Sequence, residues 1–244
     1  NVPSDCPKTA ASQKKMRDFA KENNIDFWEG KGVCHQVMME HYVCPGELIF
    51  GADSHTCSYG ALGAFGTGVG CTDLLYGMVT GKSWVLVPET VKFNLVGKLP
   101  EGVYARDLIL TIIGTIGANG CNYQVMEFTG EGAKTLSISE RMVLCNMAVE
   151  AGAKTGIFEP DEKAIEYLEA HGRKPKALFT SDPDAVYARE YTFDLSKIRP
   201  VVAKPDFVDN LVPAEEVRGV KIDEAFLGSC NNGRIEDLRV GASI

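Results

Sequence analysis

Short β-rich runs alternate with amphipathic helical patterns along most of this chain, and that alternation restricts its fold more than any other feature. The β-rich runs, which predict strands, lie at residues 25–28, 47–50, 90–96 and 125–128. The helical patterns lie at residues 10–22, 73–80, 105–116, 139–151 and 161–171. Ser139 is the predicted N-cap of the fourth helix. Alternating strands and helices are typical of α/β proteins, so we expect that fold class.

Three domains are predicted from the order of these elements. The first covers residues 1–88, and the second covers residues 89–196. Residues 197–244 hold a connector and the start of a third domain, with a strand predicted at 225–230. An extended connector is predicted over residues 172–222, because they contain five prolines and little periodicity. One strand and the start of one helix cannot bury a sheet, so we expect a fragment whose third domain is incomplete.

The composition excludes several classes of protein. The 25 basic and 33 acidic residues give a net charge of −8, the wrong sign for binding phosphate backbones, so no nucleic-acid partner is expected. The most apolar stretch, residues 108–118, is shorter than the roughly 20 residues that span a membrane, so no membrane partner is expected. The first nine residues do not resemble a secretory signal, which favours a cytoplasmic location. There the eight cysteines, which form no Cys-x-x-Cys pair, are expected as reduced thiols or metal ligands.

Asp53, Ser54 and His55 form a polar turn directly after the predicted strand at 47–50. Sites in α/β sheets form at the carboxyl ends of strands, so this turn is well placed for chemistry. Three consecutive residues cannot fold into a hydrolase triad. Ser54 and the neighbouring backbone amides could instead receive an anionic ligand. A purely structural Asx or Ser turn explains the same residues equally well.

Gly66, Gly68 and Gly70 follow in a glycine-rich stretch that invites comparison with a dinucleotide-binding loop. That fingerprint requires its third glycine at position 71, where this chain has Cys71. Tight turns or close packing therefore explain the glycines better than a nucleotide site does.

Four further residues are candidates for a site. His35 could be tuned for proton transfer by an Asp or Glu partner, or it could be a structural histidine. Asn146 and Glu150 lie four residues apart on one predicted helix face. Both side chains could point into one cleft, or this face of the helix could simply be exposed to solvent. Cys230 ends a predicted strand, where its thiolate could bind a metal or its thiol could be a small buried hydrophobe.

Five motifs, in this order and with this spacing, together resemble those of the aconitase family. They are Gly32-x-x-His35-Gln36, Gly51-Ala-Asp-Ser-His-Thr56, Gly68-Val-Gly70, Cys145-Asn-Met-Ala-Val-Glu-Ala-Gly-Ala153 and Leu227-Gly-Ser-Cys-Asn-Asn-Gly-Arg-Ile-Glu-Asp-Leu238. The resemblance covers essentially the whole chain and implies three-layer α/β/α domains, of which the first and the third are incomplete in this chain. It also implies the large, catalytic subunit of a hydro-lyase, which isomerises a hydroxy di- or tricarboxylate by dehydration and rehydration.

The same resemblance implies a [4Fe–4S] cluster held by three cysteine thiolates, with one iron left open to act as a Lewis acid. By motif position Cys230 would be the first of these ligands, and Asn146 would support the cluster edge. The family's other two cysteines form a Cys-x-x-Cys downstream of the segment that matches this chain. The implied partner is a small subunit with a swivelling domain, which carries the serine base. We therefore expect the chain alone to hold an incomplete cluster or none, and to be inactive.

The resemblance assigns catalytic roles to two histidine–carboxylate pairs, His35 with Asp53 and His55 with Glu150. A carboxylate that accepts from one imidazole nitrogen orients the ring and stabilises its charged form, which prepares the other nitrogen to donate a proton. Ser54 would bind a substrate carboxylate. Two other classes of function stay open, namely a nucleotide-binding α/β module around the glycine-rich stretch and a non-catalytic scaffold that docks a partner subunit.

Overall fold

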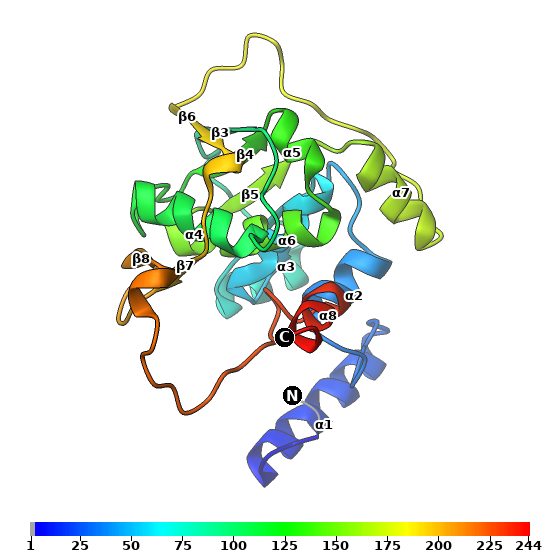
Figure 1. The fold of residues 1–244 in the computed structure, drawn as a ribbon. Coiled ribbons are helices and arrows are strands. Elements are labelled where there is room, and N and C mark those ends of the chain that lie inside the picture. Colours follow the sequence, from blue (N-terminus) through cyan, green and yellow to red (C-terminus); the bar gives the residue numbers. More distant parts are fainter. Residues whose placement is uncertain (1–2) are drawn as a thin grey trace.

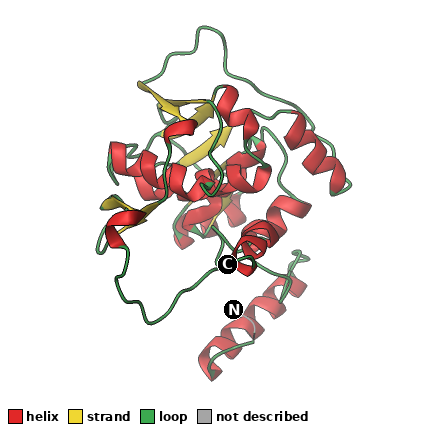
Figure 2. Cartoon of the chain, viewed as in Figure 1, coloured by secondary structure: helices red, strands yellow, loops and turns green. Residues whose placement is uncertain are grey.

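Helices and strands alternate through residues 3–244, which the computed structural model describes, and the chain is an α/β protein as predicted (Figures 1 and 2). Residues 1 and 2, which begin the first predicted domain and the stretch compared with a secretory signal, lie outside the described residues. The helices are α1 (Pro7–Glu22), α2 (Cys34–His41), α3 (Cys71–Thr80), α4 (Ala105–Ile116), α5 (Glu131–Thr135), α6 (Ile138–Asn146), α7 (Glu162–Ala170) and α8 (Ile235–Ala242). The strands are β1 (Leu48–Gly51), β2 (Phe65–Gly68), β3 (Thr90–Val96), β4 (Val125–Thr129), β5 (Thr155–Phe158), β6 (Arg189–Asp194), β7 (Val201–Ala203) and β8 (Leu211–Pro213). The 3₁₀ helices of this region are η1 (Ser54–Leu62), η2 (Met147–Ala151), η3 (Leu195–Lys197) and η4 (Ala214–Val217).

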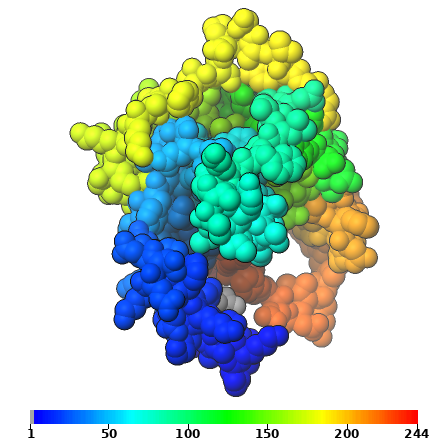
Figure 3. Space-filling model, turned by 180° about the vertical axis from the view of Figure 1, so that it is seen from behind, coloured from blue at the N-terminus to red at the C-terminus, as the bar shows by residue number. Residues whose placement is uncertain are grey.

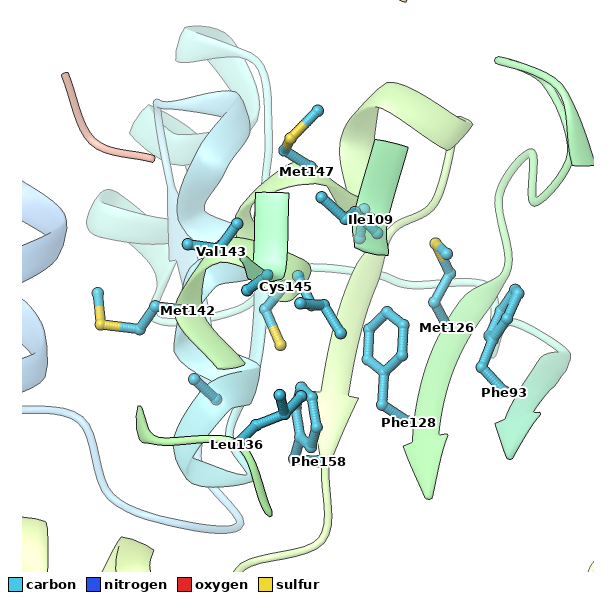
Figure 4. Close-up of a cluster of buried hydrophobic side chains, with 14 of the residues drawn as sticks. Phe93, Ile109, Met126, Phe128, Leu136, Met142, Val143, Cys145, Met147 and Phe158 are labelled. Atoms are coloured by element: carbon cyan, nitrogen blue, oxygen red, sulfur yellow. The ribbon is translucent and has the colours of Figure 1, made fainter. Parts of the chain in front are cut away.

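The central sheet has the strand order β5-β4-β3-β6, and all its strands are parallel. Side chains alternate along each strand, so Phe158, Phe128, Phe93 and Tyr191 form one row across all four strands. Their successive ring centroids are 5.1, 5.6 and 5.5 Å apart. Helices α4 and α6 cover this face, and their apolar side chains lie beside the rings in Figure 4. Each fully buried ring contributes about 1.5–3 kcal/mol by leaving water.

The opposite face of the sheet is contacted by coil that follows α7. Ser181 Oγ and Tyr187 OH both donate to Oε1 of Glu127 on β4, at 2.9 and 3.0 Å. The coil then leads into β6, which pairs with β3. The prediction of an extended connector over residues 172–222 is therefore wrong where it covers β6, β7 and β8. Their partners are distant in the sequence or very short, so local periodicity does not mark them.

The main chain of η1 lies directly on β5. A Cβ on Gly60 would lie 1.7 Å from the carbonyl oxygen of Gly156, which only glycine permits. One buried cluster accordingly includes Met39 and Leu62 together with Phe93. Residues of the first and second predicted domains thus share a core, and the division after residue 88 stays a prediction. The two-stranded parallel sheet β1–β2 lies beside η1.

Helix α6 begins and ends at residues that differ from those predicted. Its N-cap is Ser137, whose Oγ accepts from the Glu140 backbone amide at 3.2 Å while Glu140 Oε2 accepts from the Ser137 amide at 2.7 Å. The prediction of Ser139 as N-cap is wrong. The α-helix ends at Asn146, and the backbone continues as the 3₁₀ helix η2, so Glu150 does not share an α-helical face with Asn146.

The C-terminal part of the chain packs loosely. Among residues 214–244 the buried side chains are those of Asn231 and Arg234. The strands predicted at 25–28 and 225–230 are absent from the described residues, since neither run lies beside a strand with which it could pair. Helix α1 and the coil that follows η4 stand out from the body in the space-filling view (Figure 3). Within residues 3–244 no helix is both long enough and apolar enough to cross a membrane.

Candidate active site

His35 is buried near the start of α2, between a carboxylate and a phenol. Its Nε2 lies 2.9 Å from Oδ1 of Asp53, and its Nδ1 lies 3.2 Å from the hydroxyl of Tyr59 on η1. The carboxylate can only accept, so Nε2 carries the proton and Nδ1 of the neutral ring accepts from Tyr59. Burial lowers the pKa of His35, and the contact with Asp53 opposes this only in part. The neutral ring is the form that fits these partners.

Asp53 connects the two histidines. It is the N-cap of η1, and its Oδ1 accepts from the backbone amide of His55 at 2.8 Å. Burial disfavours its charge, but the His55 amide and the His35 side chain together hold the pKa of Asp53 below its usual range. The polar turn predicted after the strand at 47–50 therefore has a structural role and also holds a charged group at the site.

His55 lies between an acid and a thiol. Its Nε2 is 3.7 Å from Oε1 of Glu150 on η2, and its Nδ1 is 3.6 Å from Sγ of Cys230. Its ring lies edge-on to that of His35, with centroids 6.5 Å apart. The interaction with Cys230, followed by that with Glu150, raises the pKa of His55 to about 10 against the effect of burial. His55 is thus held as an imidazolium at neutral pH.

The partners of His55 are correspondingly acidic. The contact with His55 lowers the pKa of the Cys230 thiol to about 7. A hydrogen bond from Asn146 lowers this pKa further, whereas burial of the thiol raises it. The same histidine lowers the pKa of Glu150, again against partial burial. The group therefore consists of one imidazolium flanked by a carboxylate and by a thiol that is partly ionised at neutral pH.

Asn146 joins this group to its surroundings. Its Nδ2 donates to Ser58 Oγ at 2.9 Å and lies 3.5 Å from Sγ of Cys230. Its Oδ1 accepts from Nδ2 of Asn231 at 2.9 Å, and Asn231 in turn accepts from Arg106 at 2.6 Å. Both ends of the amide of Asn146, which was predicted as a site residue, therefore form hydrogen bonds, and its NH₂ group lies beside the Cys230 sulfur.

A cleft of about 1070 Å³ lies where these elements meet. It is lined by residues of η1, α4, α6, η2 and the C-terminal segment, among them His55, Arg106, Asn146, Glu150, Cys230 and Asn231. Of the residues predicted from the sequence, His35 and Asp53 do not line this cleft, and neither does Ser54. Its side chain is exposed and lines a neighbouring cavity of about 470 Å³ together with Gly68 and Lys154.

The glycines compared with a dinucleotide loop serve close packing in this structure. A Cβ on Gly66 would lie 2.3 Å from the carbonyl oxygen of Thr56, and one on Gly68 would lie 2.8 Å from that of Asp53. Gly70 is the N-cap of α3. Tight packing of β2 against η1 therefore accounts for the first two of these glycines.

Arg106, Asn231, Tyr59 and Ser58 belong to the site but were not predicted from the sequence. Asn231 directly follows Cys230, so the motif around the cysteine was a signal for it. Arg106 lies in the first turn of α4, 124 positions before Cys230, and only the tertiary fold brings the two elements together.

The thiolate donors of residues 3–244 do not suffice for an iron–sulfur cubane. Cys230 is the cysteine of the cleft, whereas burial raises the pKa of Cys57 to about 12 and keeps that thiol protonated. No group of three or more His, Cys, Asp or Glu side chains in this region is arranged to hold a metal ion. One thiolate cannot take the place of the three that such a cluster requires, so these residues do not fit the complete group by themselves.

Comparison with known proteins identifies the family. Residues 2–218 match the sequence profile of the aconitase family (aconitate hydratase). The chain belongs to the aconitase family. The chain is 51% identical to the 3-isopropylmalate dehydratase large subunit of Hydrogenobaculum sp.. This match covers all of the present chain and 58% of that protein. The chain is 50% identical to large subunit 1 of the same name from Methanopyrus kandleri, covering 59% of that protein.

A third relative within the aconitase family carries a different name. The chain is 48% identical to the probable methanogen homoaconitase large subunit of Methanothermobacter thermautotrophicus, over all of this chain and 58% of that protein. The chain therefore spans a little under three fifths of the length of these curated relatives.

Proposed function

We propose that the complete protein is the large subunit of 3-isopropylmalate dehydratase, a hydro-lyase that interconverts 2- and 3-isopropylmalate by dehydration and rehydration in leucine biosynthesis. The names of the two relatives at 50 and 51% identity support this substrate. The observation that carries the reaction class is the pair of histidine–carboxylate contacts, His35 with Asp53 and His55 with Glu150, whose rings lie 6.5 Å apart beside Cys230.

His55 is the proposed proton donor of the cleft. Both ring nitrogens of His35 are engaged, by Asp53 and by Tyr59, so this histidine orients Asp53 rather than delivering a proton itself. Glu150 faces Nε2 of His55 and favours its charged form, which leaves the Nδ1–H directed towards the thiol side of the cleft. A proton delivered from Nδ1 would turn a substrate hydroxyl into water as the leaving group.

Cys230 is proposed as one thiolate ligand of the iron–sulfur cluster that the aconitase family implies for the complete subunit. Its lowered pKa and its place on the cleft support this assignment. Asn146, which donates towards its sulfur, would support the cluster edge. Ser54 is proposed to bind a substrate carboxylate from the neighbouring cavity, where its hydroxyl is exposed.

A small subunit that carries the swivelling domain is the proposed partner, because the relatives are named large subunits. A reducing, cytoplasmic location is proposed because all eight cysteines are free thiols in the described part of the chain. Homocitrate-derived substrates are the second candidate, since one relative at 48% identity is named a homoaconitase large subunit.

The test uses the complete large subunit, reconstituted anaerobically with its cluster and combined with the small subunit. His55→Gln keeps hydrogen-bonding groups but cannot carry the proton, so kcat for dehydration of 3-isopropylmalate should fall by about 10²–10⁴-fold. The control is His41→Gln, since His41 is exposed and lies outside the cleft.

The other outcomes each decide against the proposal in a different way. Unchanged activity in His55→Gln would indicate a scaffold that docks a catalytic partner. Turnover of homocitrate-derived substrates in place of isopropylmalate would move the protein to the homoaconitases. Saturable micromolar binding of NAD or ATP by a protein without hydro-lyase activity would favour a nucleotide-binding module.

A further inference from the structure

The segment that carries Cys230 is attached to the protein by few contacts. Residues 226–234, here called the Cys230 segment, contain two buried side chains, Asn231 and Arg234, and both are polar. Arg234 donates to the backbone carbonyls of Cys230 and Asn231, so these bonds stay within the segment. Of these two buried residues, Asn231 is therefore the one whose side chain forms hydrogen bonds to other parts of the described chain.

The amide of Asn231 is held on both sides. Its Oδ1 accepts from Nη1 of Arg106 at 2.6 Å, and its Nδ2 donates to the carbonyl oxygen of Val143 at 3.2 Å and to Oδ1 of Asn146 at 2.9 Å. A guanidinium can only donate and a backbone carbonyl can only accept. These two neighbours therefore fix which end of the amide faces Arg106 and which end faces α6.

The orientation of Asn146 follows from that of Asn231. Because Asn231 presents its NH₂ group, Asn146 must turn its Oδ1 towards it. The NH₂ group of Asn146 then faces Ser58 Oγ at 2.9 Å and Cys230 Sγ at 3.5 Å. The result is a directed chain of hydrogen bonds that starts at the donor-only Arg106 and ends with an N–H beside the sulfur.

Arg106 is itself held on a fixed base. It lies in the first turn of α4, where the backbone amide of Tyr104 donates to Oδ2 of Asp107 at 3.0 Å. Oδ1 of the same aspartate accepts from the backbone amide of Val201 at 3.0 Å, so the helix start is also tied to β7. A charged donor on such a base forms a stronger hydrogen bond than a neutral one.

We propose that Arg106 is a positioning residue, which holds the Cys230 segment against α6 through Asn231 and directs the side-chain amides so that Asn146 offers an N–H to the Cys230 sulfur. The value of this arrangement for catalysis rests on the proposed function. The positioning itself is a property of this chain and is tested without substrate, cofactor or partner.

The first measurement is hydrogen exchange by mass spectrometry on the purified 244-residue chain and on Arg106→Met. Loss of a charge-assisted bond should raise the exchange rates of the Cys230 segment about tenfold or more. Exchange in β3 and β4 should stay unchanged. Arg106→Lys, which restores a charged donor, should recover most of the protection. Arg199→Met is the matched control, because Arg199 is exposed and does not line the cleft.

The second measurement tests the direction of the hydrogen bonds. In the ¹⁵N-labelled chain, the side-chain NH₂ resonances of Asn146 and Asn231 should shift in Arg106→Met and return towards their original positions in Arg106→Lys. Asn231→Asp keeps an acceptor for Arg106 but removes the donor that faces Asn146. It should therefore displace the Asn146 resonances as strongly as Arg106→Met does.

Two results would overturn the proposal. In the first, Arg106→Met leaves both the exchange of the Cys230 segment and the Asn146 resonances as in the original chain. In the second, exchange rises equally in β3 and β4, which would make Arg106 a general support of the fold. Neither result depends on whether the complete protein turns over isopropylmalate, so failure here is separate from failure of the proposed function.

Discussion

Nε2 of the buried His35 and Oδ1 of Asp53 lie 2.9 Å apart, in a contact between a neutral ring and a carboxylate. Asp53 favours the charged form of the ring while burial disfavours it, so the two effects act on the pKa of His35 with opposite signs. Each neighbour of this ring can therefore be tested separately.

Asp53→Asn should lower the pKa of His35 further. The substitution removes the negative charge but keeps an oxygen that can accept from the His55 amide, so the turn is retained. The measurement is an NMR titration of the His35 ring protons. Asp223→Asn, at an exposed position, is the control and should leave the titration unchanged. A rise in the pKa of His35 would contradict the assignment of Asp53 as its charge partner.

Tyr59→Phe should change the same titration in the opposite direction. The Tyr59 hydroxyl donates to Nδ1 of the neutral ring, so its removal takes away a bond that only the neutral form makes, and the pKa of His35 should rise. A buried acceptor is left unpaired, so the free energy of unfolding should fall by about 1–3 kcal/mol. Tyr76→Phe, on the exposed side of α3, should change neither quantity.

Asp161→Asn should destabilise the protein by about 3–5 kcal/mol at pH 7, because it leaves a buried guanidinium without its ion partner. Arg141 is 1% exposed and bonds both carboxylate oxygens of Asp161, at 2.8 and 2.5 Å. Asparagine can still cap α7, so the loss reports the ion pair. Urea unfolding gives the difference, and Asp18→Asn, at an exposed ion pair, should cost less than about 1 kcal/mol.

The same pair gives a pH dependence of known sign. Burial alone would raise the pKa of Asp161, but the hydrogen bonds and charge of Arg141 hold it below its usual range. Its contribution to stability is therefore full above the usual Asp pKa of about 3.9 and is lost as the pH falls through the lower folded value. The difference in unfolding free energy between the original chain and Asp161→Asn should narrow below about pH 4. A difference that widens there would contradict this.

Gly60→Ala should destabilise the protein by at least about 2 kcal/mol, because the new methyl group would meet a backbone carbonyl that cannot move aside. Gly77→Ala is the matched control in α3, where the nearest atom to a new Cβ is 3.9 Å away. There alanine should stabilise the helix by about 0.5–1 kcal/mol. Thermal unfolding of both variants should show a lower melting temperature for Gly60→Ala and a higher one for Gly77→Ala. Equal changes in melting temperature would contradict the direct packing of η1 against β5.

Local patterns predicted much of the fold. The strand at residues 90–96 and the helix at 105–116 have the predicted bounds, since a long alternating run and a long apolar helical face identify themselves. The strand β6 was missed because its pairing edge comes from β3, nearly a hundred residues earlier. The residues at 25–28 and 225–230 have the composition of strands but no neighbouring strand to pair with in the described part of the chain.

The candidate site divides in the same way. His35, Asp53, His55, Glu150, Asn146 and Cys230 were all named from sequence motifs, and the structure brings them around one group of contacts. Their roles stay predictions. Arg106 could not be predicted as a site residue, because nothing in the sequence around it indicates its hydrogen bond to Asn231, which only the tertiary fold brings close. Ser54 was named, but its side chain lines a different cavity from that of His55, Asn146, Glu150 and Cys230.

The contact of Gly60 with Gly156 leaves no side-chain layer between the segment that carries His55 and the central sheet. A hinge motion of the segment that carries His55 relative to the sheet would therefore disrupt contacts between main-chain atoms and could not proceed by rearrangement of side chains alone. Met39, Val43 and Leu62 belong to the same buried cluster as the side chains of the sheet, so α2, η1 and the sheet should melt in a single cooperative transition. Movement that widens the cleft is then expected at the Cys230 segment, in which Asn231 and Arg234 are the buried side chains.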